Sequence, residues 1–185
     1  MKVLGCIIAG GKSTRMGQNK ALMQWRDKPL IAHVVDRLTP QVAQLIVNTN
    51  GDAAPLAFLH LPIIADLVDM ETPLAGLHAA LNYANRHRFD AVLTAPCDTP
   101  LLPLDLCERL KGEGPAVAAS GDRVHYLTGF WPVGVLAMFK RPPRRVMDFA
   151  ASVAARQVTW PATDIDPFVN LNTQDDVVAL DRMIR

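Results

Sequence analysis

The chain has few of the features that mark secreted, membrane-bound or nucleic-acid-binding proteins. Its three cysteines, Cys6, Cys97 and Cys107, form no C-x-x-C pair, which argues against a disulfide framework or a zinc site. No apolar run approaches the roughly 18 residues of a membrane span, and the apolar run at the N-terminus is too short for a signal peptide. A formal net charge of +1 gives no reason to expect nucleic acid or a membrane surface as a partner. We therefore expect a soluble cytoplasmic protein with reduced thiols, in which any anion site is local.

The sequence does contain the composition and the pattern of one α/β domain. Of its 185 residues, 50% are hydrophobic and 20% are charged, and it has no internal repeat, low-complexity segment or linker. Short apolar runs alternate with stretches in which apolar residues recur at helical spacing, which is typical of repeated β-α units and a mostly parallel sheet. We predict a single domain over residues 1–185. The predicted strands are 3–8, 44–47, 62–65, 91–95, 115–119, 127–131 and 158–160, and the predicted helices are 29–38, 74–85, 133–139 and 174–184.

The first predicted strand runs directly into a loop, residues 9–20 (AGGKSTRMGQNK), that contains three glycines and three cations. Glycines let backbone N–H groups approach an anion closely, and Lys12, Arg15 and Lys20 supply the positive charge that a polyphosphate needs. A tight strand-to-helix turn with solvated cations is the alternative. The density of glycines and cations favours a phosphate-binding loop.

This loop matches neither of the two best-known phosphate-binding motifs. A P-loop has the pattern G-x-x-x-x-G-K-[ST], but Cys6 stands where its first glycine should precede Gly11. The dinucleotide-binding pattern G-x-G-x-x-G fails because Gly10 and Gly11 are adjacent. The sequence therefore predicts a phosphate loop of another class.

Polar residues follow the next three predicted strands of the first half of the chain. Asn48, Asp66 and Asp98 each come directly after an apolar run. In open parallel sheets, ligands bind beyond the carboxyl ends of the strands. Polar residues are also common in plain turns, so each one alone is weak evidence. Together with the glycine-rich loop, they predict a single active site at that edge of the sheet.

Asp98 is the strongest single catalytic candidate and the predicted metal ligand. It lies between Pro96 and Pro100 at the end of a buried strand, so the backbone would orient its carboxylate. Magnesium is usually held by one or two carboxylates and completes its shell with water and phosphate oxygens, so one aspartate facing a cationic loop suffices. An Asx turn, or the N-cap of a short following helix, is the alternative role.

The pattern A-G-G-K-S-x-R-M-G-x-x-K resembles the opening signature of nucleotidyltransferases that activate a phosphate with a nucleoside triphosphate. Its double glycine is most similar to that of the molybdenum cofactor guanylyltransferase family, the MobA-like nucleotidyltransferases. The segment 97–100 (CDTP) matches the C-D-x-P of that family, and segments 144–147 and 168–173 resemble those that hold its pterin substrate. The chain departs from the family pattern where Thr72 replaces the first glycine of G-P-L-A-G, and where His125 is followed by Tyr126 rather than proline.

The resemblance implies a three-layer Rossmann-like nucleotidyltransferase fold with helices on both faces of the sheet. It further implies a nucleotide-binding half over about residues 1–100 and an acceptor-binding half over about 101–185. The activity that it implies is transfer of GMP from GTP to the phosphate of molybdopterin, with Mg²⁺ as cofactor and release of pyrophosphate. The site residues that it implies are Arg15, Lys20 and Asp98 for catalysis, Ile8, Ala9, Gly10, Gly11, Lys20, Asn48, Asp66 and Asp98 for GTP, Arg144, Arg145, Asn170 and Asn172 for the pterin, and Asp98 for the metal.

Other functions of the same fold stay open at this point. A molybdopterin cytidylyltransferase or an enzyme that charges a sugar phosphate would share the loop, although cytidylyltransferases more often have alanine-glycine in place of the double glycine. A non-catalytic nucleotide-binding protein is disfavoured because Arg15, Lys20 and Asp98 are all present. The expected partners are GTP and molybdopterin as substrates, together with proteins that deliver the cofactor or mature molybdoenzymes.

Overall fold

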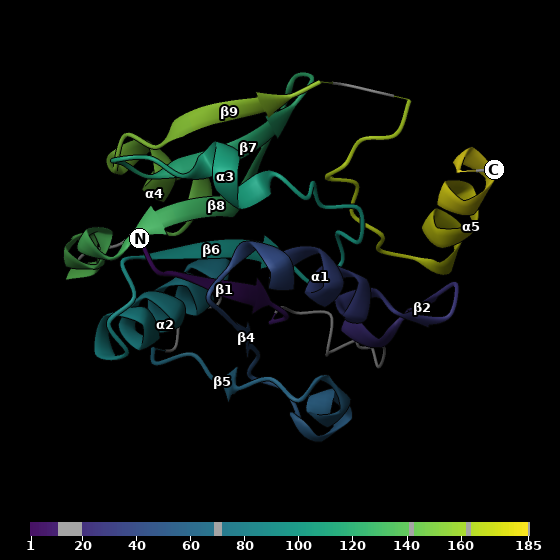
Figure 1. Cartoon of the computed structure of the whole chain (residues 1–185), viewed down its shortest axis with the longest axis horizontal. Helices are drawn as coiled ribbons and strands as arrows, with labels where there is room; N and C mark the ends of the chain where they lie inside the picture. The colour runs from purple at the N-terminus through teal and green to yellow at the C-terminus, as the bar shows by residue number, and fades with distance from the viewer. Residues whose placement is uncertain (11–19, 69–71, 141–142, 162–163, 185) are drawn as a thin grey trace.

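A seven-stranded sheet in the order β5-β4-β1-β6-β8-β7-β9 forms the centre of the protein (Figure 1). The computed structural model describes residues 1–10, 20–68, 72–140, 143–161 and 164–184. All neighbouring strands pair in parallel except β8, which is antiparallel to β6 and to β7. The predicted α/β class with a mostly parallel sheet is therefore confirmed. The strands are β1 (Val3–Ile8), β4 (Gln44–Asn48), β5 (Ile63–Ile64), β6 (Ala91–Pro96), β7 (Ala116–Ser120), β8 (Arg123–Pro132) and β9 (Arg156–Trp160).

Helices cover both faces of this sheet, as predicted. They are α1 (Leu30–Leu38), α2 (Pro73–Arg86), α3 (Leu106–Leu110), α4 (Val146–Ser152) and α5 (Gln174–Met183). Helix α2 begins where a sequence signal places it, because the Thr72 side chain accepts a hydrogen bond from the Leu74 N–H and Pro73 occupies the first turn. None of the helices in the described ranges is long and apolar enough to cross a membrane.

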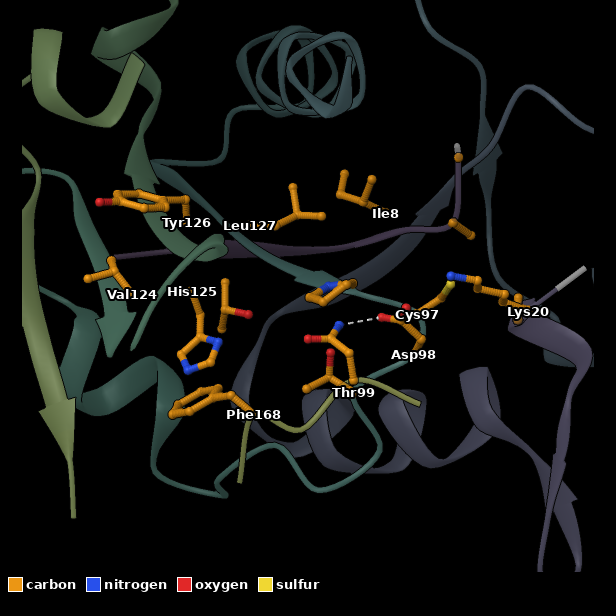
Figure 2. Close-up of a pocket in the computed structure, with 16 residues that line it drawn as sticks. Ile8, Lys20, Cys97, Asp98, Thr99, Val124, His125, Tyr126, Leu127 and Phe168 are labelled. Atoms are coloured by element: carbon orange, nitrogen blue, oxygen red, sulfur yellow. Dashed lines mark hydrogen bonds between the residues drawn. The ribbon is translucent and has the colours of Figure 1, made fainter. Parts of the chain in front are cut away.

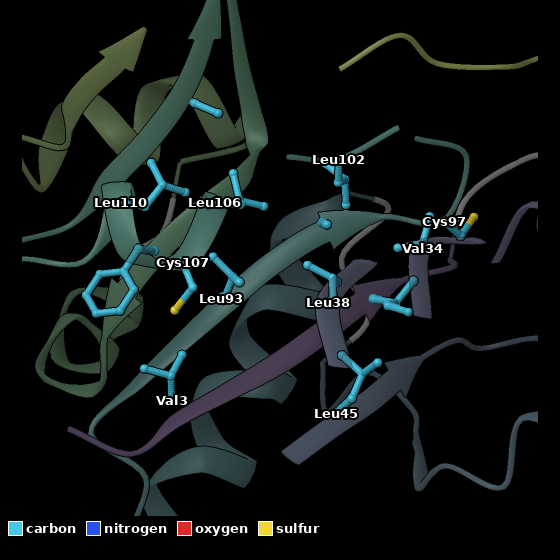
Figure 3. Packing of buried hydrophobic residues seen from close by; sticks show 14 of the residues in the cluster. Val3, Val34, Leu38, Leu45, Leu93, Cys97, Leu102, Leu106, Cys107 and Leu110 are labelled. Atoms are coloured by element: carbon cyan, nitrogen blue, oxygen red, sulfur yellow. The ribbon is translucent and has the colours of Figure 1, made fainter. Parts of the chain in front are cut away.

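Two hydrophobic clusters pack against the two faces of the sheet. Strand β1 is buried along its whole length, because a central parallel strand is covered on both sides. On one face, residues of α1 and α3, including Val34, Leu38 and Leu106, pack against Leu93 (Figure 3). The cluster on the other face includes Leu4, Leu74, Leu77, Trp131 and Phe149. Each such side chain contributes about 1.5–3 kcal/mol by leaving water, so the two clusters fix the strand ends in space.

The structure differs from the sequence prediction mainly in short elements. The two-residue strands β2 (Gln24–Trp25) and β3 (Lys28–Pro29) form a hairpin that the sequence analysis missed, as it missed α3 and α4. None of these is long enough to show periodicity. Strand β8 begins four residues before the predicted strand, and the segment predicted as a short helix is a 3-10 helix, Val133–Lys140.

His78 on α2 gives the fold a predictable dependence on pH. Its ring packs against Phe139 with 4.9 Å between ring centroids, and its Nδ1 is buried with no hydrogen-bond partner among the described residues. Burial lowers the pKa of His78 below its ordinary value of 6.5. The unfolded chain therefore binds the proton more tightly, so stability should fall as the pH drops below 6.5 towards the pKa of the folded state.

The measurement is urea unfolding of the wild type and of His78→Phe at pH 7.5 and pH 5.5. The variant keeps an aromatic contact with Phe139 but cannot titrate, so its midpoint should shift less between the two pH values than that of the wild type. Comparing the two shifts cancels the contributions of other titrating groups. Equal shifts would rule out this role of His78.

Candidate functional site

A cavity of about 350 Å³ opens beside the carboxyl ends of β1 and β6 (Figure 2). Strand β8 runs in the opposite direction, so its first half lies at the same edge. This places the cavity where the convergence of strand ends predicted a site. Its lining residues are Ile8, Ala9, Gly10, Lys20, Ala21, Pro96, Cys97, Asp98, Thr99, Val124, His125, Tyr126, Leu127, Thr128, Phe168 and Asn170.

The predicted nucleotide-binding residues at the start of the glycine-rich loop line this cavity. Ile8 ends β1, and the backbone ladder continues past it, because the Ala9 N–H donates to the Asn48 carbonyl at 2.8 Å and the Cys97 N–H to the Ile8 carbonyl at 3.2 Å. The backbone at residues 8–10 is therefore held between β4 and β6. Gly11, which was predicted to bind GTP, and Arg15, which was predicted to be catalytic, lie outside the described residues, and their roles stay predictions.

Asn48 and Asp66 come together on the β4 side of β1. Asn48 is 2% exposed, and its Nδ2 donates to Asp66 Oδ1 at 2.9 Å. Asn50 fixes the other side of this pair, because its Oδ1 accepts from the Asp66 N–H at 2.8 Å and its Nδ2 donates to Asp66 Oδ2. The ends of β4 and β5 therefore lie together, and the predicted role of this pair in GTP binding stays a prediction. Neither Asn48 nor Asp66 is among the residues that line the cavity.

Gly76 of α2 allows the helix to approach this pair. An alanine Cβ at this position would lie well inside contact distance of Asn48 Oδ1 and 3.1 Å from Ile8 Cδ1. A side chain at residue 76 would thus displace Asn48. The absence of a Cβ here is what lets α2, β1 and β4 meet.

Asp98 and Lys20 are each paired with an asparagine from the same short segment. Asn170 Nδ2 donates to Asp98 Oδ1 at 2.8 Å, and Lys20 Nζ donates to Asn172 Oδ1 at 2.6 Å (Figure 2 draws the first of these). The Leu171 N–H, between them, donates to the backbone carbonyl of Asp98 at 2.9 Å. Segment 170–172 therefore joins the predicted metal ligand to the predicted phosphate-binding lysine.

Helix α5 holds this segment in place. Its N-cap Thr173 and Asp176 form a capping box, and Asp176 also accepts from the Asn172 N–H at 2.8 Å. These backbone N–H groups lower the pKa of Asp176 below its ordinary value. At the other end of α5, Asp181 accepts from the Trp25 indole N–H at 2.9 Å, and Figure 1 shows α5 beside the β2 hairpin. Helix α5 thus holds Asn172 at its N-terminus and packs against Trp25, which lies five residues after Lys20.

Cys97 adjoins Asp98 in the cavity but has no nucleophilic character. Burial, and next the negative charge of Asp98, raise the pKa of Cys97 to about 12. It therefore stays a neutral thiol at physiological pH. The same cause, burial, keeps the pKa of Cys6 far above its ordinary value.

The predicted pterin-binding arginines are separate from the cavity. Arg144 and Arg145 are exposed and directly precede α4, with Arg145 at its N-cap position. Neither lines the cavity. Their assignment to the acceptor stays a prediction, whereas Asn170 lies in the cavity and Asn172 contacts Lys20.

Sequence reasoning missed the β8 wall of the cavity. Residues 124–128 line it, and none of them was predicted as a site residue, whereas Thr99 and Phe168, which also line it, lie in segments 97–100 and 168–173 that the resemblance had singled out without assigning them a role. The histidine at position 125 was visible in the sequence as part of a motif that departs from the family pattern. It was assigned no role, because the five histidines are scattered along the sequence and show no metal-ligand spacing.

The chemistry around Asp98 suits a magnesium ion held together with a phosphorylated substrate. Among residues 1–10, 20–68, 72–140, 143–161 and 164–184, no three histidine, cysteine or carboxylate side chains cluster as metal ligands. These described residues therefore provide no metal site with three or more such protein ligands. Asp98 Oδ1 accepts from Asn170, and the hydrogen bonds of the described residues leave its Oδ2 available. One carboxylate with phosphate and water oxygens is the usual arrangement for Mg²⁺.

Comparison with known proteins gives consistent results. The family model of the MobA-like NTP transferase domain matches residues 5–155. A molybdenum cofactor guanylyltransferase from Cereibacter sphaeroides is 41% identical over 193 aligned residues, which cover 100% of this chain and 98% of that protein.

Solved structures share the fold at lower identity. The molybdopterin-guanine dinucleotide biosynthesis protein A of Archaeoglobus fulgidus is 22% identical, with a TM-score of 0.73 over 100% of this chain and 98% of that one. A Mycobacterium tuberculosis protein crystallised with manganese is 18% identical, with a TM-score of 0.69 over 97% of this chain and 98% of that one.

Proposed function

The chain belongs to the MobA-like NTP transferase family, and we propose that it transfers GMP from GTP to the phosphate of molybdopterin, forming the guanine dinucleotide cofactor. The observation that carries the proposal is the similarity over the full length of the chain to a protein of that activity, at 41% identity. The meeting of Asp98, Lys20 and Asn170 at one cavity supports it. The protein is accordingly a nucleotidyltransferase of molybdenum cofactor biosynthesis.

In this proposal GTP lies across the carboxyl end of β1. The backbone at residues 8–11 and the Asn48–Asp66 pair contact the nucleoside, because they combine close backbone approach with amide and carboxylate groups that can distinguish a base edge. Arg15 and Lys20 bind the phosphates. The half of the chain up to about residue 100 thus serves the donor, and the half from about residue 101 serves the acceptor.

The acceptor half supplies the pterin contacts. Asn170 and Asn172 carry both donor and acceptor atoms, which a pterin ring edge requires, and Arg144 and Arg145 offer positive charge to its phosphate. Asn170 lies in the cavity beside Asp98, which supports its part in this assignment. We assign the protein to the cytoplasm, with cofactor-delivering and molybdoenzyme-maturation proteins as partners.

The reaction needs alignment more than acid–base chemistry. An oxygen of the molybdopterin phosphate attacks the α-phosphorus of GTP, a new P–O bond forms, and the bond to the oxygen that bridges to the β-phosphate breaks. Pyrophosphate leaves with that electron pair. The attacking phosphate is already an anion, so no general base is required.

Charge neutralisation and positioning then account for the rate. Arg15 and Lys20 place positive charge against the triphosphate. Asp98 would hold Mg²⁺, which when bound supplies charge stabilisation to the phosphate oxygens. The backbone of β6 and the hydrogen bond from Asn170 keep the Asp98 carboxylate at a fixed position between the donor and acceptor halves.

The direct test is incubation of the protein with Mg²⁺, GTP and molybdopterin. We expect pyrophosphate release and a guanine dinucleotide product by mass spectrometry, at a kcat/KM at least tenfold higher with GTP than with CTP. A preference for CTP would instead indicate a cytidylyltransferase. GTP binding without pyrophosphate release would indicate a non-catalytic nucleotide-binding protein.

A further inference from the structure

The β8 side of the cavity is built by an irregularity in the sheet. Along β7 and β8, Val117 pairs with Gly129 but the next residue, Ala118, pairs with His125. Three residues of β8, Tyr126, Leu127 and Thr128, therefore have no counterpart on β7. Bulges of this kind re-aim side chains and are frequent next to active sites. All residues from His125 to Thr128 line the cavity.

His125 is held in a fixed orientation within this wall. Its ring stacks on Phe168, with 4.7 Å between centroids and 28° between planes, and its Nε2 lies 2.7 Å from Ser120 Oγ. Asp166 Oδ2 is a further 3.9 Å neighbour of Nε2. Figure 2 shows the imidazole projecting from β8 into the cavity beside Phe168. Because Nε2 is occupied, Nδ1 is the atom left for a ligand.

The side chain of His125 is largely sequestered yet neutral. It is 14% exposed, and burial lowers its pKa below 6.5, with Asp166 opposing and Arg123 adding to this effect. A neutral imidazole carries one donor and one acceptor nitrogen. It therefore suits a heteroaromatic ring edge rather than a phosphate, for which a cation would be expected.

Thr99 provides a second, independent indication of a polar ligand here. It is 1% exposed and lines the same cavity, and its Oγ1 has no hydrogen-bond partner among the described residues. A buried hydroxyl without a hydrogen-bond partner is unfavourable, because the cost of its desolvation is not compensated. A ligand group, or a water held by a ligand, that meets this hydroxyl would recover that cost.

The position of this wall identifies which substrate it faces. The sheet order puts β4, β5 and the Asn48–Asp66 pair on one side of β1, and β6 with Asp98, then β8, on the other. With the donor nucleoside on the β4 side, the space beyond Asp98 is left for the acceptor. The cavity volume of about 350 Å³ is within the range of small-molecule sites.

Resting on the proposed function, we propose that the planar ring of the acceptor binds against His125 and Phe168, with His125 Nδ1 and Thr99 Oγ1 as polar contacts that select a pterin. Ser120 is then a positioning residue, because it acts through His125. This places the ring-recognition residues on β8 and after β6, in addition to the asparagines of segment 170–172.

The test uses binding of a fluorescent probe, neopterin monophosphate, to the full-length protein without GTP. His125→Phe keeps the ring stacked on Phe168 but removes the nitrogens, and Thr99→Val keeps the shape but removes the hydroxyl. We expect each to weaken probe binding about tenfold or more, and Ser120→Ala to weaken it about threefold. The matched control is His87→Phe, because His87 stacks on Tyr83 at 4.1 Å but is exposed and outside the cavity. Its probe affinity should equal that of the wild type.

GTP affinity separates this inference from the proposed function. We expect all four variants to bind GTP as the wild type does, which also shows that they are folded. The inference would be overturned if His125→Phe and Thr99→Val bound the probe as tightly as the wild type, or if the wild type did not bind the probe. It would also be overturned if these two variants lost GTP affinity rather than probe affinity. The proposed function is tested separately, by whether the wild type forms the dinucleotide product.

Discussion

Replacing Asp98 with asparagine should lower kcat about 10³-fold or more while leaving the fold intact. The side chain keeps its shape, and its remaining oxygen can still accept the hydrogen bond from Asn170 Nδ2. What disappears is the negative charge that, under the proposed function, would hold Mg²⁺. Loss of such a contact raises the activation free energy by several kcal/mol, because the charge of the transition state is less well stabilised. Pyrophosphate release under saturating GTP and molybdopterin measures the effect.

Asp52→Asn is the control that matches the loss of charge. Asp52 is exposed and follows β4, and the hydrogen bond that it accepts from the described residues is a local one, from the Ala54 N–H. Its substitution should leave turnover within about twofold of the wild type. Thermal unfolding of both variants should occur within a few degrees of the wild type. An Asp98→Asn protein with substantial activity would remove Asp98 from the metal-binding role.

Gly76→Ala should raise the KM for GTP about tenfold or more. The new Cβ cannot coexist with Asn48 in its observed place, so Asn48 must shift, which should disturb its hydrogen bond to Asp66. Overpacking of this kind costs about 1–3 kcal/mol, offset in part because alanine favours a helix over glycine by about 1 kcal/mol. The measured quantities are GTP affinity and the thermal midpoint of the same preparation.

Gly134→Ala separates the steric effect from a general effect of adding a methyl group. A Cβ at Gly134 would have no heavy atom within 4 Å among the described residues, so its substitution should change neither GTP affinity nor stability measurably. If Gly76→Ala bound GTP normally, Asn48 would not be a nucleoside contact. If it simply failed to fold, the affinity of Asn48→Ala for GTP would test the same role of Asn48.

The sheet was predictable because its central strands obey simple rules. Val3–Ile8 is apolar throughout because both faces are covered, and α2 combines an N-cap, a proline and helical periodicity. The β2–β3 hairpin and α3 were missed because their conformation comes from tertiary packing rather than from local preference. Trp25, for example, is held by Asp181, a residue 156 positions away.

The donor side of the site was more accessible to sequence reasoning than the acceptor side. Asn48 ends a strand, Asp66 and Asp98 come shortly after one, and strand ends converge by topology alone. His125 enters the cavity because of a bulge in β8, which depends on how that strand pairs with β7. The unpaired state of Thr99 Oγ1 is likewise a property of the packed structure. The motif at His125 was visible in the sequence, but its position in the cavity and the unpaired state of Thr99 depend on the packed structure.

The hydrogen bond between Lys20 and Asn172 also bears on how the protein folds. It joins residues 152 positions apart, a wider separation than that of Val3 and Ala91, which pair between β1 and β6 in the sheet. Closing the long loop between such distant residues costs conformational entropy before the contact contributes any stabilisation. Such contacts therefore tend to form late. The two halves of the cavity should therefore be joined only near the end of folding. During refolding, recovery of nucleotide binding would then lag behind recovery of helical circular dichroism, because the sheet can form before segment 170–172 closes over it.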